Sequence, residues 1–387
     1  MVDISQAPDG VFQTGPFPHF QRALGLFRPV GVRVITRAVV CVAIGWLPLV
    51  VLVIAQSGSN PSILYAFFTD FAVHARSLVA APLFIISELL CLSALEKIAR
   101  HFITTGLIEG DERLRFKAYA DSTRRLINSR VAEVVCIVAV YVIVVGIMSY
   151  VPQDVFPEWS FIDGRLSWAG GWSMFVSAPL LLVLFFSWLW RILLWGRFLF
   201  RTSRLHLRLI AAHPDCAAGL RFLNSAIFAF MPFAFTLGII AAGTVANRVA
   251  HERALLDRVE MTLLGLAVFV LLLVAGPLIV FVFNLHAQKL RGTFRYGLLA
   301  QNVGRDFEKK WLENYDKYGD DALEAPDFSA TTDLYGIASN IQNMSHFPFE
   351  VKALIALIVV TLLPFVPVAL MAIPFKVILK EAASLLF

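Results

Sequence analysis

The chain of 387 residues is 58% hydrophobic and only 16% charged, with a mean hydropathy of +0.73. Soluble domains carry about 25% charged residues, so this composition excludes a soluble globule with an ordinary polar surface, and it also excludes a disordered chain. The net charge of +5 is typical of membrane proteins with basic cytoplasmic loops, and we expect no nucleic-acid binding. The predicted fold class is all-α: a polytopic membrane bundle of about seven transmembrane helices with helical cytoplasmic extensions.

Seven segments are apolar over a length close to the roughly 20 residues that a spanning helix needs. They are 34–55, 77–95, 131–151, 173–195, 224–246, 261–284 and 353–374. Segment 62–76 carries three ionisable residues, so we expect an interfacial or re-entrant helix before the second span. Prolines inside spans are expected to kink their helices, because each removes a backbone hydrogen bond. These are Pro82, Pro179, Pro232, Pro277, Pro364 and Pro367.

The basic residues predict the orientation. With the N-terminus inside, the N-terminal region and the loops on the same side hold 24 Lys and Arg residues, against 7 on the other side. The positive-inside rule then places the N-terminus in the cytoplasm and the C-terminus in the periplasm or outside the cell.

Four parts follow from this topology: a cytoplasmic segment 1–33, a six-span bundle 34–284, a cytoplasmic subdomain 285–350, and the last span with its tail, 351–387. The bundle includes helical cytoplasmic loops, 96–130 and 196–223. In the subdomain we expect span six to continue to about Tyr296, followed by an amphipathic segment, an acidic loop and a short helix, 333–344. We see no internal repeat, and Gly238 with Ala242 forms a small-xxx-small pair suited to close helix packing.

Glu88 is the most costly residue, because a carboxylate in hydrocarbon costs about 3 kcal/mol even on permissive insertion scales. It is either a functional intramembrane group or a structural hydrogen-bond partner of another helix. Asp70, His74 and Arg76 lie before it, and could form an outer vestibule leading to Glu88 or the solvated face of an amphipathic helix. We expect Arg191 to extend to the inner interface; the alternative is a counter-ion to Glu88.

Four arginines follow the fourth span at a spacing of four, three and four residues: Arg197, Arg201, Arg204 and Arg208. On a helix this spacing places them on one face, where they could bind anionic lipid headgroups, attract anions to a pore mouth, or simply fix the topology. His213-Pro214-Asp215 comes next. We expect Pro214 to end the basic helix and Asp215 to cap the following one. The alternative is a functional pair in which His213 titrates near neutral pH.

Motifs for known chemistry are missing from the sequence, including nucleotide-binding glycine loops, hydrolase elbows and zinc-protease helices. The four cysteines form no metal-ligand spacing, and we expect neither a metal nor a cofactor. Catalysis is therefore disfavoured, although the question stays open.

Three segments, HARSLVAAPLFIISE (74–88), HPDCAAGLRFL (213–223) and LLPFVPVALMAIPFKVILK (362–380), resemble blocks in a group of bacterial multi-pass inner-membrane proteins of unassigned function. The resemblance implies a bacterial inner-membrane location and no particular activity.

The leading hypothesis from the sequence is a channel or transporter for an ion or small solute, expected to be a homo-oligomer. The first alternative is a non-transporting scaffold or signalling protein that docks a cytoplasmic partner or senses anionic lipid. A third hypothesis is a lipid-acting enzyme that uses His213 and Asp215 at the headgroup level.

Overall fold

The computed structural model describes residues 32–58, 60–252, 257–313 and 326–372. The protein is 83% helical with almost no sheet, which confirms the predicted fold class. Within these described residues, six helical segments are long and apolar enough to cross a membrane. They are Val34–Ser57, Phe71–Thr104, Arg130–Tyr150, Trp168–Ser203, Arg221–Ala250 and Val259–Trp311. A bent pair, Val351–Leu362 with Phe365–Met371, makes a seventh if it is counted as one span.

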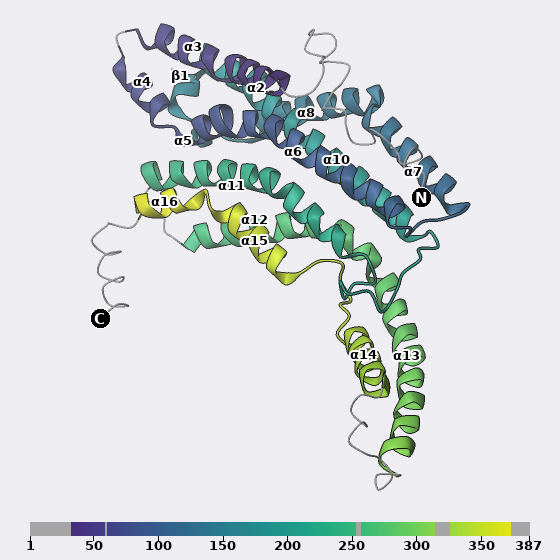
Figure 1. Cartoon of the computed structure of the whole chain (residues 1–387). Coiled ribbons are helices and arrows are strands. Elements are labelled where there is room, and N and C mark those ends of the chain that lie inside the picture. Colours follow the sequence, from purple (N-terminus) through teal and green to yellow (C-terminus); the bar gives the residue numbers. More distant parts are fainter. Residues whose placement is uncertain (1–31, 59, 253–256, 314–325, 373–387) are drawn as a thin grey trace, which may run out of the picture.

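The helices that make up these spans form two groups (Figure 1). The first group contains α2 (Val32–Gly45), α3 (Leu47–Ser57), α6 (Ala81–Thr104), α8 (Arg130–Tyr150) and α10 (Ala178–Ser203). The second group contains α11 (Ser225–Glu252), α12 (Asp257–Ala275), α15 (Val351–Leu362) and α16 (Phe365–Ala372). The groups meet where α11 packs along α6.

Shorter elements connect the spans. Expected segment 62–76 is split into α4 (Pro61–Phe68) and α5 (Phe71–His74) by a break at Thr69. Loop 96–130 contains α7 (Glu112–Ile127), which begins just after the expected break near Gly110. A two-stranded hairpin that we did not predict, β1 (Phe161–Ile162) and β2 (Arg165–Leu166), precedes α9 (Trp168–Trp172). Asp163 and Gly164 form its tight turn with positive φ angles of 52° and 71°, as in two-residue hairpin turns.

The intramembrane prolines act in different ways. Pro82 and Pro179 each follow a π-helical segment, η2 (Ala75–Ala80) and η5 (Ser173–Ser177), and Pro277 lies in the 3-10 segment η7 (Gly276–Phe281). Pro364 lies at the break between α15 and α16, where the axis bends by 50°. Pro232, in contrast, lies inside the continuous helix α11. The expected distortions therefore occur at most of these positions, and most take the form of local changes in helix type.

Helix α11 approaches its neighbours closely through glycine. A Cβ atom added at Gly238 would lie 2.0 Å from the carbonyl oxygen of Thr361 on α15. One added at Gly243 would lie 2.4 Å from the Cβ of Ala75 in η2. Ala242 is buried in the contact with Phe365. Gly238 and Ala242 thus allow close packing within the second group, and Gly243 allows α11 to approach η2 in the first span group, as in other membrane bundles.

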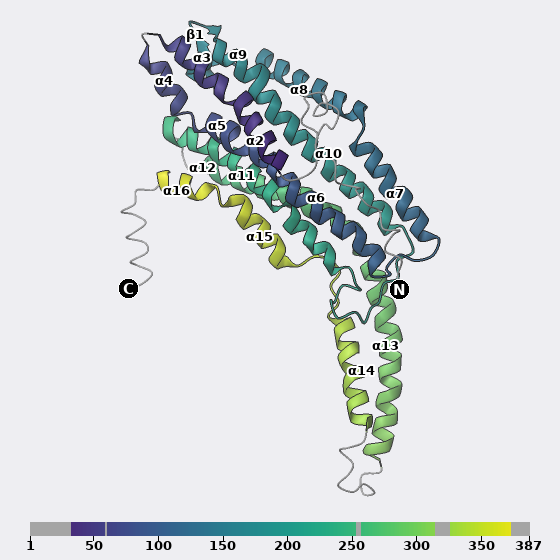
Figure 2. The ribbon, with the colours of Figure 1, turned by 45° about the horizontal axis from the view of Figure 1, so that its top comes forward.

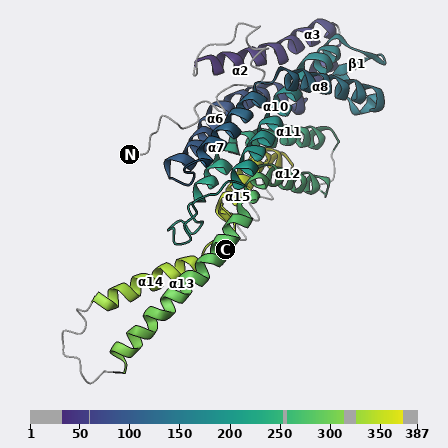
Figure 3. The same cartoon turned by 90° about the vertical axis from the view of Figure 1, so that its right-hand side faces the viewer.

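The last feature is a helical arm. Span six does not stop near Tyr296 but continues as α13 (Val282–Trp311), a helix about 45 Å long at 1.5 Å per residue. Helix α14 (Pro326–Gln342) packs back along it, and it begins earlier than the expected 333–344. The arm extends away from the bundle in all three views (Figures 1, 2 and 3). Phe307 and Trp311, from the expected amphipathic segment, contact Phe328 near its tip.

Candidate functional site

The membrane acid, Glu88, lies at the meeting point of three helices. Its side chain accepts from Arg37 on α2 through Oε2 and from Arg191 on α10 through Oε1, with 3.0 Å between the atoms in each case. Glu88 is 3% exposed and Arg191 4%. The expectation that Arg191 reaches the interface is wrong, because the guanidinium stays inside the bundle as a counter-ion to the carboxylate.

Aromatic packing holds this ion cluster in place. The Arg191 guanidinium lies 5.7 Å from the ring centre of Trp188, a distance at which a cation is attracted to the ring face. The Trp188 indole N–H donates to the Phe84 carbonyl oxygen on α6. A buried carboxylate is tolerated only when its charge is paired and hydrogen-bonded, and both conditions hold for Glu88.

Arg37 was not among the residues predicted from the sequence, although an arginine at the fourth position of an apolar segment was a usable signal. We treated it as part of the basic N-terminal region, where positive-inside counting offered a sufficient explanation. Only the packing of α2 on α6 shows that its side chain turns inward, 13% exposed, to the acid of the second span.

Asp70, His74 and Arg76 do not form a shared open cluster. Asp70 is 2% exposed. It caps α5 by accepting from the Val73 N–H, and it also accepts from the indole N–H of Trp159. The alternative of a solvated face on an amphipathic helix is therefore wrong for Asp70.

His74 and Arg76 use separate partners. The Trp46 indole N–H lies 3.0 Å from His74 Nδ1, and His74 Nε2 lies 3.1 Å from the Phe67 carbonyl oxygen. Both contacts are satisfied by a neutral ring protonated at Nε2. Arg76 donates to the Ala72 carbonyl oxygen. These local contacts stabilise the break between α4 and α5, and a pathway from this cluster to Glu88 stays a prediction.

The four arginines after the fourth span do not share one helical face, because α10 ends at Ser203. Arg197 donates to the Ser122 hydroxyl and Arg201 lies over the Tyr119 ring, both on α7. Arg204 lies over the Phe200 ring. Arg208 is beyond the helix and pairs with Glu109. The first two arginines therefore pack against α7, whereas Arg204 and Arg208 are exposed.

The His213-Pro214-Asp215 segment forms a compact capped turn. Asp215 accepts from the N–H groups of Ala217, Gly219 and Arg221, and His213 Nδ1 lies 2.8 Å from its carboxylate. Burial raises the pKa of Asp215, but the hydrogen bonds from these four groups outweigh it and hold the pKa below its usual range. The geometry agrees with the expected capping role, although the cap joins a short 3-10 turn, η6 (Arg221–Asn224).

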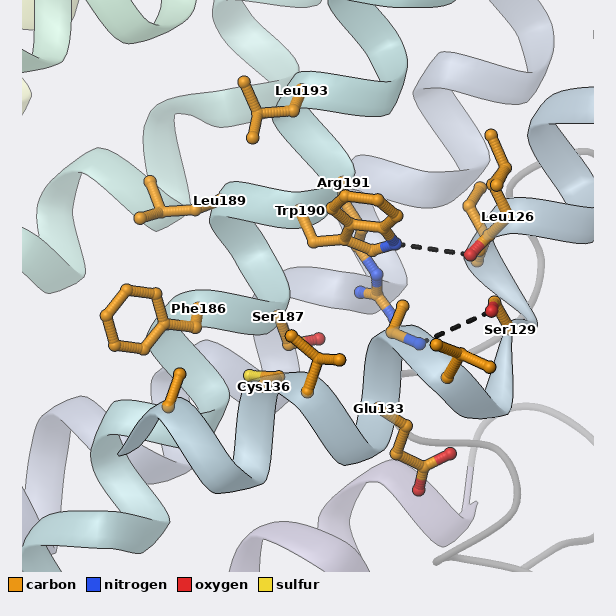
Figure 4. Close-up of a pocket in the computed structure, with 15 residues that line it drawn as sticks. Leu126, Ser129, Glu133, Cys136, Phe186, Ser187, Leu189, Trp190, Arg191 and Leu193 are labelled. Atoms are coloured by element: carbon orange, nitrogen blue, oxygen red, sulfur yellow. Dashed lines mark hydrogen bonds between the residues drawn. The ribbon is translucent and has the colours of Figure 1, made fainter. Parts of the chain in front are cut away.

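An apolar groove opens between α8 and α10 close to the ion cluster (Figure 4). Its volume is about 640 Å³. Trp190 closes one side by donating its indole N–H to the Leu126 carbonyl oxygen. Glu133 and Arg191 are the charged lining residues, and most of the remainder is hydrocarbon. The groove suits an acyl chain better than a polar solute.

Metal chemistry finds no support in the part of the chain that the structure describes, where no group of three His, Cys, Asp or Glu side chains could hold an ion. No family model, no curated protein and no solved structure matches this chain.

Proposed function

We propose that this integral membrane protein is a non-transporting scaffold whose arm, α13 with α14, docks a soluble partner in the cytoplasm. The cytoplasmic placement follows from the excess of basic residues on the side of the membrane where the arm lies. The observation that carries the proposal is an exposed apolar stripe along α13, the helix that extends away from the bundle (Figure 2).

The stripe consists of Leu290, Phe294 and Leu298, which are 51%, 70% and 60% exposed. Their spacing of four residues places them on one side of a helix. A Cβ atom added at Gly292, two residues before Phe294, would lie 3.1 Å from the Ile341 side chain of α14. Since two residues turn a helix by about 200°, the stripe lies on the side of α13 that faces away from α14.

Charge favours one kind of partner. Helix α13 carries six Lys and Arg residues and two acidic residues, and Arg291 and Arg295 directly follow stripe residues. A second copy docked through the same face would bring like charges together, whereas apolar residues rimmed by carboxylates would complement it. We therefore assign the stripe to a soluble partner with such an acidic rim.

The transport hypothesis that we drew from the sequence loses its main support once the contacts of Glu88 are known. That hypothesis depended on an available carboxylate in the membrane, and Glu88 is held by two guanidinium groups. The neighbouring groove is largely apolar. Neither feature supplies the chain of polar groups that would replace water around a moving ion.

The test is site-specific photocrosslinking in intact cells, with the photoreactive residue at Phe294 and, as a control, at Thr332, which is exposed on α14. We expect one adduct of fixed mass from position 294 and none from position 332. Leu298→Asp and Arg295→Glu should each remove most of that adduct. A position 294 that gives no adduct would contradict the docking proposal.

A second measurement addresses transport directly. Purified protein in sealed vesicles should carry no ion flux above that of empty vesicles. Flux through the wild-type protein above that of empty vesicles would overturn the scaffold proposal.

A further inference from the structure

A second cavity lies where the end of α10 meets the start of α13. Its volume is about 720 Å³. Gly276–Phe283 of span six and Phe200–Leu209 contribute most of the lining, and α13 adds residues as far as Arg291. Among the described residues that line it, none is Asp or Glu.

The lining changes from apolar to basic in the same direction along both helices. On one wall, exposed Phe200 precedes Arg204 by four residues. On the other, exposed Ile279 and Phe283 precede Arg291. Phe283 and Arg291 are separated by eight residues, or about 12 Å along a helix. The apolar parts belong to the ends of spans, so the cavity crosses the boundary between hydrocarbon and headgroups.

Both guanidinium groups are open to a ligand. Arg204 and Arg291 are exposed, and Arg204 contacts the Phe200 ring with no carboxylate beside it among the described residues. Asn284 and Gln288 use their amide N–H groups to bind the carbonyl oxygens of Ser203 and Leu209, which fixes the two walls relative to each other. His206 lies 3.3 Å from Glu112, and this carboxylate is not part of the lining.

We propose that this cavity binds an anionic phospholipid of the inner leaflet, with the phosphodiester between Arg204 and Arg291 and the acyl chains along Ile279 and Phe283. Guanidinium groups bind phosphate oxygens in a bidentate fashion. The exposed phenylalanines supply the hydrocarbon contact that free phosphate cannot use. Because α13 also forms the arm, the lipid would brace the base of the arm against the bundle.

The experiment uses the full chain in detergent and three probes: dioctanoyl phosphatidylglycerol, dioctanoyl phosphatidylcholine and inorganic phosphate. Binding is measured by native mass spectrometry and by the shift in Tm. We expect dioctanoyl phosphatidylglycerol to bind at least tenfold more tightly than the other two probes. Each arginine near an anionic lipid contributes about 1 kcal/mol, so Arg204→Gln with Arg291→Gln should weaken binding roughly thirtyfold.

Two further variants distinguish binding in the cavity from a general effect of positive charge on α13. Arg305→Gln removes one exposed charge from α13 outside the cavity and should leave lipid affinity unchanged. Ala287→Trp keeps both arginines but fills the cavity, and it should abolish lipid binding. Equal binding of inorganic phosphate would replace the lipid with a free anion, while unchanged affinity in the double arginine variant would overturn the site. The crosslink at Phe294 reports on partner docking separately, so either proposal can fail alone.

Discussion

Two arginine-containing regions of this chain place positive charge in opposite environments. Inside the bundle, Arg37 and Arg191 each lie 3.0 Å from an oxygen of Glu88, and all three side chains are largely shielded from solvent. At the junction of α10 and α13, Arg204 and Arg291 are exposed beside a cavity whose described lining has no acidic residue.

The difference indicates where ligand binding is to be sought. A charge buried in hydrocarbon must be paired by the protein itself, because each unpaired ion costs several kcal/mol. A charge at the headgroup boundary needs no internal partner, since water or lipid phosphate solvates it. The bundle cluster is therefore expected to determine stability, and the junction to determine binding.

Breaking the bundle cluster should produce the largest effect. Glu88→Gln leaves two buried guanidinium groups without a carboxylate, and loss of one partner of a buried pair costs about 3–5 kcal/mol. We expect the free energy of unfolding to fall by that amount, measured by circular dichroism during denaturation in mixed micelles. Glu308→Gln, at an exposed position on α13, is the matched control and should change little.

A compensated variant sharpens the same comparison. Arg37→Met with Glu88→Leu and Arg191→Met replaces the whole cluster by apolar side chains of similar size. Because such replacements are often neutral or stabilising, we expect stability to return close to the wild-type value. A triple variant that folds stably but loses a cellular function would show that the cluster does more than hold three helices together.

The close packing of α11 against α15, within the second helix group, should be the next most sensitive feature. Gly238→Ala places a methyl group 2.0 Å from a backbone oxygen of α15, so a helix must move, at a cost of about 1–3 kcal/mol. Gly265→Ala, on α12, meets nothing within 4 Å and should be neutral or slightly stabilising, because alanine favours the helix. If Gly238→Ala and Gly265→Ala changed the free energy of unfolding in the same direction, close packing at Gly238 would not explain the loss of stability.

Sequence patterns predicted the helical membrane fold because hydrocarbon demands long apolar runs, and this demand is local in the chain. The partner of Glu88 was not predictable in the same way, since Arg37, 51 residues earlier, and Arg191 meet it only through packing. The position at which a helix ends was also not predictable from the residue spacing. The spacing of Arg197 to Arg208 suggested one face, but α10 stops at Ser203 and the set divides. The capping role of Asp215 was predictable because it depends on neighbours within six residues.

Asp215 should contribute a smaller and pH-dependent stabilisation. Its folded-state pKa lies below the ordinary value of 3.8, so the folded protein binds this proton more weakly than the unfolded chain. The contribution is therefore complete above the ordinary value and is lost as the pH falls through the lowered pKa. Asp215→Ala should cost about 1–2 kcal/mol at pH 7, and the difference from wild type should shrink only below about pH 4. A difference that already changes between pH 8 and 6 would contradict this account.

Changes on the arm should have the smallest effect on stability. Phe294→Ser with Leu298→Ser removes two side chains that are mostly exposed and lie on the side of α13 away from α14. Surface substitutions of this kind usually change the free energy of unfolding by less than about 0.5 kcal/mol, so the denaturation curve should overlay that of wild type. The same variant should lose the crosslinked partner, because the apolar contact is absent. A large loss of stability would instead indicate that the stripe is already covered in the folded protein, by a second copy or by membrane, and the unfolding midpoint would then depend on protein or lipid concentration.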